Sequence, residues 1–159
     1  MWYSRVVKVA ITSVAAMEAF GAQLGALFTG GEVIELVGDV GAGKTALTKG
    51  LAIGMGIEED VQSPTFTVSR VYTGKNVILA YYDFYRLDDP GIMRAELQET
   101  MLDPMTVTVI EWANVVADVL PPDTLQIRMS FSGMSETLRE IEIVAGGARS
   151  RELMEQLQQ

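Results

Sequence analysis

Hydrophobic and polar positions along the chain predict strands and helices in alternation. Val6–Ile11 and Val33–Val37 are β-rich runs, and between them apolar residues recur every three or four positions. This spacing predicts an amphipathic helix that begins at Ser13, a suitable N-cap, and ends at residues 30–31. A second helix is expected over about residues 44–55, directly after a glycine-rich turn.

The remaining two thirds of the chain contain further β-rich runs and three more helical patterns. The expected strands are residues 65–72, 77–82, 106–110, 125–131 and 138–144. Helices are expected over 91–102, over about 113–119 and in a polar tail at the end of the chain. The loop 73–76 predicts a hairpin, and Pro121 ends the helix before it. We predict one α/β domain over residues 1–159, with three layers, a mixed central sheet and antiparallel hairpins at its edges.

Two absent residue types narrow the possible chemistry. Among 159 residues there is no cysteine and no histidine, which excludes disulfides, thiol nucleophiles, imidazole bases and zinc sites of the usual kind. Hard cations with oxygen ligands remain possible. Hydrophobic residues make up 48% of the chain, enough for a core, so we expect an ordered domain.

The most informative motif is Gly38-Asp39-Val40-Gly41-Ala42-Gly43-Lys44-Thr45, which fits G-x-x-x-x-G-K-[ST] at every fixed position. A hydrophobic strand precedes the motif and a helical pattern follows it. Glycines let successive backbone N–H groups face phosphate oxygens at the helix N-terminus. Lys44 would reach the outer phosphates and the Thr45 hydroxyl would bind magnesium. The segment predicts a P-loop NTPase-like domain that binds a nucleoside triphosphate.

Two acidic residues end predicted strands and could complete this site. Asp83 follows Ile78-Leu79-Ala80-Tyr81-Tyr82, and Glu111 follows Val107-Thr108-Val109-Ile110. A phosphate loop needs a second acid at the end of a neighbouring strand, to hold the magnesium shell and position the attacking water. Both residues are candidates for that role, although an acid at a strand end is also a common solvated cap.

Three further features leave alternatives open. Ser63-Pro64-Thr65-Phe66 is either a turn that feeds a strand or a switch-like segment whose Thr65 senses the terminal phosphate. Trp112 either packs in the core, which the pattern favours, or stacks on a base. Arg86 either pairs with Asp83, binds a phosphate or forms a surface ion pair. No Asn-Lys-x-Asp element for guanine occurs, which favours ATP.

Charge and hydropathy bear on partners and location. Twelve basic and 21 acidic residues give a net charge of −9, and the basic residues are scattered, so we expect no strong direct binding to tRNA or other nucleic acid. The apolar stretch 9–17 is interrupted by polar residues, and no run approaches the length of a membrane span. We expect no membrane association and a cytoplasmic location.

Taken in series, the phosphate loop, Ser63-Pro64-Thr65-Phe66, Asp83-Phe84-Tyr85-Arg86-Leu87 and Ile110-Glu111-Trp112 resemble the TsaE family. These small bacterial ATPases are required to form threonylcarbamoyladenosine on tRNA next to the anticodon. The resemblance runs over roughly residues 30–115 and departs at Ala46, where the family usually has a second threonine, and at Leu97-Gln98, where a glycine is expected.

The resemblance implies roles for individual residues. Lys44 would bind phosphate, Thr45 and Glu111 would be associated with magnesium, and Asp83 would be required for activity and lie close to the metal. Thr65 would belong to a switch-like loop that takes part in catalysis, and Trp112 would lie beside the nucleotide. We expect Ser13 and Arg139 to contact the nucleotide as well.

The resemblance also implies partners. TsaE-like proteins act with the TsaB–TsaD pair, in which TsaD transfers the threonylcarbamoyl group, and they use ATP binding or hydrolysis to reset that complex. The leading hypothesis is therefore an accessory ATPase that uses ATP and magnesium. A small-molecule kinase with the same loop and a nucleotide-sensing adaptor that does not hydrolyse ATP are the alternatives.

Overall fold

The computed structural model describes residues 6–39, 41–133 and 137–159. Val40 of the phosphate loop lies outside the described residues. Strands and helices follow one another as β1 (Val6–Ile11), α1 (Val14–Gly25), β2 (Val33–Val37), α2 (Lys44–Gly54), β3 (Ser69–Thr73), β4 (Ile78–Asp83), α3 (Ile92–Leu102), β5 (Thr106–Glu111), η1 (Ala113–Val119), β6 (Thr124–Phe131), β7 (Arg139–Ala145) and α4 (Ala148–Leu157).

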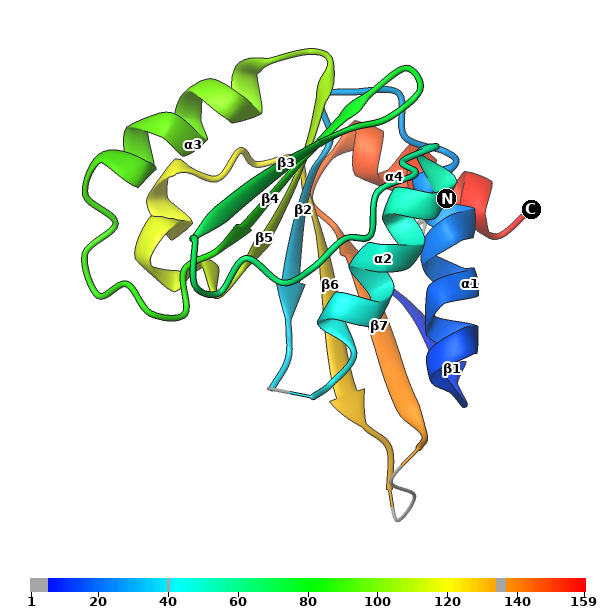
Figure 1. The fold of residues 1–159 in the computed structure, drawn as a ribbon. Helices are drawn as coiled ribbons and strands as arrows, with labels where there is room; N and C mark the ends of the chain where they lie inside the picture. Colours follow the sequence, from blue (N-terminus) through cyan, green and yellow to red (C-terminus); the bar gives the residue numbers. More distant parts are fainter. Residues whose placement is uncertain (1–5, 40, 134–136) are drawn as a thin grey trace.

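In the described part of the chain, all seven strands form one mixed sheet in the order β1-β7-β6-β2-β5-β4-β3 (Figure 1). The central strands β6, β2, β5 and β4 run parallel, whereas β3 pairs antiparallel with β4 at one edge and β7 and β1 pair antiparallel at the other. The predicted α/β class, with a mixed sheet and antiparallel hairpins at the edges, is confirmed.

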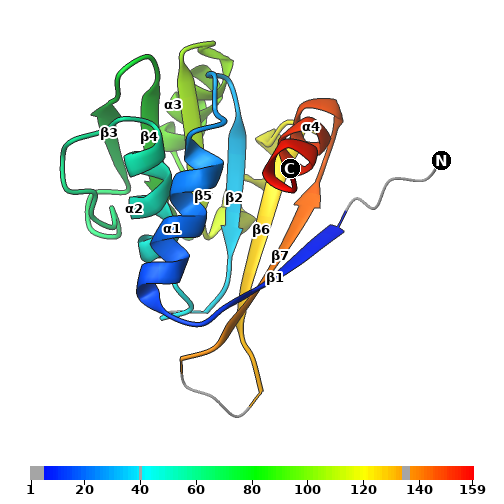
Figure 2. The same ribbon diagram turned by 90° about the vertical axis from the view of Figure 1, so that its right-hand side faces the viewer.

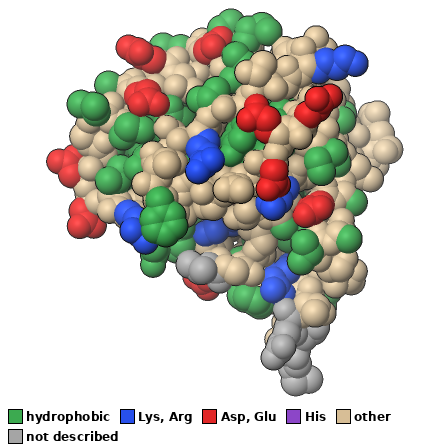
Figure 3. Space-filling model, in the orientation of Figure 1, with side chains coloured by type: hydrophobic (Ala, Val, Ile, Leu, Met, Phe, Trp, Pro, Cys, Tyr) green, Lys and Arg blue, Asp and Glu red, His purple; other side chains and the backbone are tan. Residues whose placement is uncertain are grey.

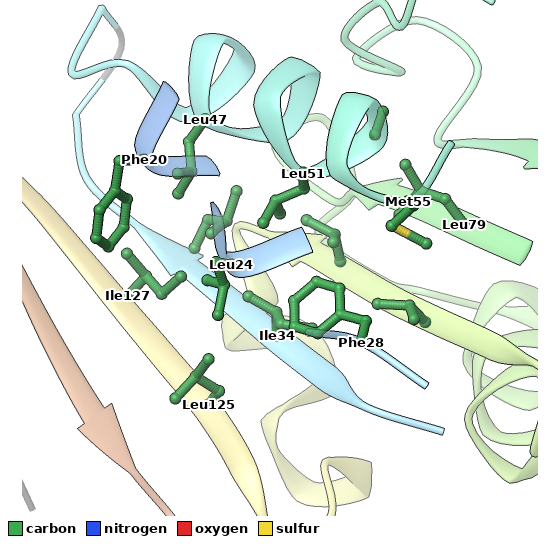
Figure 4. Close-up of a cluster of buried hydrophobic side chains, with 14 of the residues drawn as sticks. Phe20, Leu24, Phe28, Ile34, Leu47, Leu51, Met55, Leu79, Leu125 and Ile127 are labelled. Carbon is green, nitrogen blue, oxygen red and sulfur yellow. The ribbon is translucent and has the colours of Figure 1, made fainter. Parts of the chain in front are cut away.

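Helices cover both faces of the sheet, so the chain forms three layers (Figures 1 and 2). One face carries α1 and α2, whose side chains share a buried cluster with Ile34 of β2 and Ile127 of β6, as Figure 4 shows. The opposite face carries α3 and the 3-10 helix η1, which bury Leu97 and Val116 against Val33. Successive side chains along each strand point to opposite faces of the sheet, as the two-residue period of a strand requires.

Helices α1 and α2 pack backbone against backbone. A Cβ atom added at Gly25 would lie 2.2 Å from Leu51 O, and one added at Gly50 would lie 2.2 Å from Glu18 O. Gly21 and Gly54 are equally close to the facing helix, at 2.5 Å from Leu47 O and 2.3 Å from Ala22 O. The glycines are four residues apart in each helix and therefore lie on one face. The contact fixes α1 against the helix that follows the phosphate loop.

Three predicted elements differ from the structure. The helix expected to reach residues 30–31 ends at Gly25, because the next residues form tighter turns, with Phe28 N donating to Gly25 O at 3.2 Å. Phe28 is still buried, so the apolar spacing continues past the helix. The strand predicted at residue 65 begins at Ser69, and residues 113–119 form a 3-10 helix.

Ser13 caps α1 as predicted, since its hydroxyl accepts a hydrogen bond from Ala16 N at 3.0 Å. In residues 6–39, 41–133 and 137–159, none of the helices combines the length and the hydropathy needed to cross a membrane.

Candidate functional site

The phosphate loop connects β2 to α2 at the carboxyl end of the parallel strands. Gly41 and Gly43 have φ of 84° and 110°, values that favour glycine over residues with a side chain. A Cβ at Gly43 would also lie 2.9 Å from Met17 Cε. Helix α2 begins directly after Gly43, so its free backbone N–H groups face the space above the loop. The local structure is that of an anion-binding turn.

The side chain of Lys44 lies across this loop. Only 7% of the residue is exposed. Its Nζ donates to Gly38 O at 2.6 Å and lies 4.2 Å from the centre of the Trp112 ring. A buried ammonium group needs such partners, and a phosphate oxygen would be a stronger one than a neutral carbonyl.

Asp83 and Glu111 end neighbouring parallel strands, β4 and β5, and are paired in register. Each is 3% exposed. Because both occupy the same position across two parallel strands, they project from the sheet toward α2 and the phosphate loop, and they line one hollow with Lys44 and Thr45. The structure brings together the two acids and the loop residues that the sequence singled out.

Burial gives Glu111 an unusual pKa. Removal of the carboxyl from water raises its pKa from 4.5 to about 7, and the negative charge of Asp83 acts in the same direction. A hydrogen bond from the Tyr81 hydroxyl to Oε1, at 2.5 Å, and the charge of Lys44 oppose the rise. Burial also raises the pKa of the Tyr81 hydroxyl well above its ordinary value, so this group stays a donor.

Thr65 is hydrogen-bonded to Asp83. Its Oγ1 donates to Asp83 Oδ2 at 2.7 Å and is 2.8 Å from Ser63 Oγ, while Tyr85 N donates to Asp83 Oδ1 at 2.9 Å. Residues 65–67 form a turn, in which Val68 N donates to Pro64 O at 2.7 Å, instead of the predicted strand. The turn places the Thr65 hydroxyl at the site, where a strand would have carried it along the sheet edge.

Two non-glycine residues with positive φ lie beside the acids. Trp112, directly after Glu111, has φ of 55°, and Val68, whose carbonyl accepts from Asp83 N at 2.8 Å, has φ of 69°. Such conformations cost about 1–3 kcal/mol each and persist only where the surrounding structure imposes them. Strain is therefore concentrated where β3, β4 and β5 hold the acids.

The hollow that the two acids share with Lys44 and Thr45, called the first hollow from here on, has a volume of about 350 Å³. It is lined by Gly41, Gly43, Lys44, Thr45, Ala46, Ser63, Thr65, Asp83, Tyr85, Glu111 and Trp112. A second hollow of about 330 Å³ adjoins it and shares Gly41, Gly43 and Ala46. Its other lining residues are Thr12, Ser13, Val14, Met17, Ala42, Thr137 and Arg139. Both Ser13 and Arg139 thus face the loop from the side opposite to the acids.

Trp112 and Arg86 take positions that the sequence left open. Trp112 is half-buried, lines the first hollow and lies 4.8 Å from the Tyr85 ring, centre to centre. It therefore packs against the core and also faces the site. The Arg86 guanidinium lies 4.3 Å from the centre of the exposed Phe66 ring, and the Arg139 guanidinium lies over Phe131 at 4.0 Å.

Sequence reasoning missed Tyr81 and Tyr85. Tyr81 precedes Asp83 by two residues and so shares its face of β4, a signal that the two-residue period of the strand contains. The importance of Tyr85 follows only from its contact with Trp112 and from the hydrogen bond of its N–H to Asp83.

Magnesium fits the donor set of the first hollow. The Thr45 hydroxyl and the two carboxylates are hard oxygen ligands of the kind that Mg²⁺ prefers. Across the described ranges no group of three or more acidic, histidine or cysteine residues gathers to form an all-protein cage. Magnesium bound here would therefore take its remaining ligands from phosphate and water, as is usual for Mg²⁺.

Comparison with known proteins identifies the family. The protein-family model described as "Threonylcarbamoyl adenosine biosynthesis protein TsaE" matches residues 11–141 of this chain. The tRNA threonylcarbamoyladenosine biosynthesis protein TsaE of Bacillus subtilis is 40% identical over 131 residues, which cover 80% of this chain and 78% of the relative. Its counterpart in Treponema pallidum is 39% identical over 125 residues, 78% of this chain and 90% of the relative.

The likeness extends to three dimensions. The crystal structure of Bacillus subtilis YdiB matches with a TM-score of 0.81 at 30% identity, over 99% of this chain and 97% of that one. The match covers the sheet, the phosphate loop and the strands that carry the acids. With a family model across most of its length and relatives at 39–40% identity, the chain belongs to the TsaE family of tRNA threonylcarbamoyladenosine biosynthesis proteins.

Proposed function

We propose that the protein binds and hydrolyses ATP with magnesium, and that this ATPase cycle serves threonylcarbamoyladenosine formation on tRNA. One observation carries the proposal: Lys44 and Thr45 of the phosphate loop share a single hollow with the buried carboxylates of Asp83 and Glu111. Hydrolysis of a phosphoanhydride needs a phosphate cradle, a cation and oriented acids, and none of these requires histidine or cysteine.

Different residues bind the phosphate end and the opposite end of the nucleotide in this proposal. Loop N–H groups and Lys44 would hold the phosphates, while Thr45, with Glu111 or Asp83, would hold magnesium, which would withdraw charge from the phosphates. The Thr65–Asp83 hydrogen bond holds Asp83 in one orientation, which supports a role for this acid in positioning the attacking water. Ser13, Trp112 and Arg139, around the loop and the second hollow, are the proposed contacts to the rest of the nucleotide.

The charges around the first hollow support the proposal that a partner activates hydrolysis. Within the described part of the chain, Lys44 is its basic lining residue and no arginine lines it. An arginine that reaches the transferring phosphate is worth about 10³–10⁵ in rate. We therefore propose slow hydrolysis by the isolated protein and acceleration by the TsaB–TsaD pair, which the ATPase resets between turnovers.

Phosphate release from ATP in the presence of magnesium tests the proposal, with and without TsaB–TsaD. We expect slow release by the protein alone, at least tenfold faster release with the pair, and none by Lys44→Ala. Equal rates with and without the pair would refute the role of the partner. Transfer of phosphate to a metabolite instead of water would identify a kinase, and ATP binding without turnover would identify a sensing adaptor.

A further inference from the structure

Tyr81 is a buried tyrosine whose hydroxyl points at the site without lining it. It lies in β4, two residues before Asp83, and its side chain is 0% exposed. In the parallel pair β4–β5, Tyr81 is registered with Val109, so Glu111 is two residues further along the neighbouring strand on the same face. The phenol therefore reaches diagonally across the two strands to the carboxylate.

The contact between the two side chains is short and directional. Tyr81 Oη donates to Glu111 Oε1 at 2.5 Å, a distance typical of an O–H donor with an anionic acceptor. The hydrogen bond fixes one of the two carboxylate oxygens of a residue that is itself 3% exposed. Tyr81 lines neither hollow, so it contacts Glu111 from the side of the protein core.

Tyr81 also packs against α2. The ring packs in the buried cluster that contains Leu47 and Leu51 of the same helix. Tyr81 thus joins the Glu111 carboxylate on β5 to the core that α2 shares with the sheet.

We propose that Tyr81 is a positioning residue, which holds the Glu111 carboxylate in the orientation that ATP hydrolysis requires. The inference rests on the proposed function. Groups that orient a ligand-holding carboxylate typically change metal affinity or activity by about 10- to 100-fold when removed. Tyr81→Phe removes one oxygen atom and preserves the ring that fills the core.

Tyr82 provides a matched control in the next position. It is also buried, and its hydroxyl donates to Glu96 at 3.1 Å and lies 2.9 Å from Thr100 Oγ1. These partners belong to α3, on the opposite face of the sheet. Tyr82→Phe therefore removes an equivalent hydroxyl from the same strand without touching Glu111.

The experiment compares wild type, Lys44→Ala, Tyr81→Phe, Tyr82→Phe, Glu111→Gln and the double variant Tyr81→Phe/Glu111→Gln. Hydrolysis of Mg-ATP is measured with TsaB–TsaD present. We expect kcat of Tyr81→Phe to fall about tenfold with KM within about twofold of wild type. Tyr82→Phe should stay within about twofold in both constants. The double variant should hydrolyse ATP no more slowly than Glu111→Gln alone, because Tyr81 acts through Glu111.

A second measurement needs no nucleotide. Unfolding of the same set in urea gives a double-mutant cycle, in which direct contact between Tyr81 and Glu111 makes the unfolding constants non-additive by at least about twofold. If Tyr81→Phe fails to fold, Tyr81→Met, which also lacks the donor but fills the same space flexibly, takes its place.

The outcomes separate the two proposals. A wild-type rate equal to that of Lys44→Ala overturns the ATPase and the role of Tyr81 together. An active wild type with an unchanged kcat in Tyr81→Phe, an equal loss in Tyr82→Phe, or additive losses in the double variant overturns the role of Tyr81 alone.

Discussion

At the scale of single residues, the site depends on charged groups that are almost entirely removed from water. Lys44, Asp83 and Glu111 are each less than a tenth exposed, and burial of a charge is unfavourable unless partners compensate for it. Gly38 O and the Trp112 ring compensate Lys44, Thr65 compensates Asp83, and Tyr81 compensates Glu111. Each partner therefore stabilises the side chain in a single orientation before any ligand arrives.

Loss of the lysine should abolish tight ATP binding. In Lys44→Ala we expect the Kd for a non-hydrolysable ATP analogue with magnesium to rise at least about 100-fold, because a buried charge-assisted contact to phosphate is worth about 2–5 kcal/mol. Isothermal titration calorimetry measures this change. Lys49→Ala, on the same helix but paired with Asp60 at 3.6 Å outside both hollows, should bind as wild type does. An unchanged Kd in Lys44→Ala would remove the basis of the site assignment.

The pKa of Glu111 predicts a pH-dependent stability. Its value of about 7 in the folded chain exceeds the ordinary 4.5, so between these values the folded state binds more protons than the unfolded state. The free energy of unfolding then falls as the pH rises through this window, by about 3 kcal/mol in total.

Glu111→Gln removes this titration. Relative to wild type, the variant should gain roughly 3 kcal/mol of stability on going from pH 4.5 to pH 8, as measured by urea unfolding at both values. Glu58→Gln, at an exposed position, should show no such gain. A pH-independent difference between Glu111→Gln and wild type would contradict the raised pKa.

At the scale of elements, the close contact of α1 and α2 is a strict packing constraint. Alanine normally stabilises a helix by about 1 kcal/mol relative to glycine. In Gly50→Ala the new methyl group would meet the Glu18 carbonyl, which costs about 3 kcal/mol or more and outweighs that gain, so we expect a net loss of about 2 kcal/mol. Chemical denaturation measures this change in the free energy of unfolding. Ala19→Gly, on the exposed side of α1, calibrates the propensity effect and should cost about 1 kcal/mol. A more stable Gly50→Ala protein would refute the backbone contact.

The elements also show what the sequence could and could not predict. The strands that end at Asp83 and Glu111 were predicted within one residue, because period and β-branched composition are local signals. The turn at Thr65 was predicted as strand, since its composition is β-rich and only the hydrogen bonds to Pro64 and Asp83 distinguish it. The role of Tyr81 depends on which strand lies beside β4, and the glycine contacts depend on which helices meet. Neither is encoded locally.

At the scale of the whole molecule, the net charge of −9 opposes direct binding of tRNA. On the face that Figure 3 shows, acidic and basic side chains are interspersed. We expect no saturable binding of labelled tRNA by the isolated protein up to about 100 µM at about 0.15 M salt, as followed by fluorescence anisotropy. Addition of TsaB–TsaD should produce binding. Micromolar, salt-sensitive binding by the protein alone would show that it contacts the RNA itself.

The register of β4 against β5 limits how the length of this chain can change. An insertion or deletion of one residue within either strand, before its acid, would turn Asp83 or Glu111 to the face that α3 covers. Residues 88–91, the largely exposed part of the loop before α3, carry no such restriction. Changes in length over the history of the family should therefore accumulate in that loop, while the spacing of Tyr81 to Asp83 and of Val109 to Glu111 stays fixed.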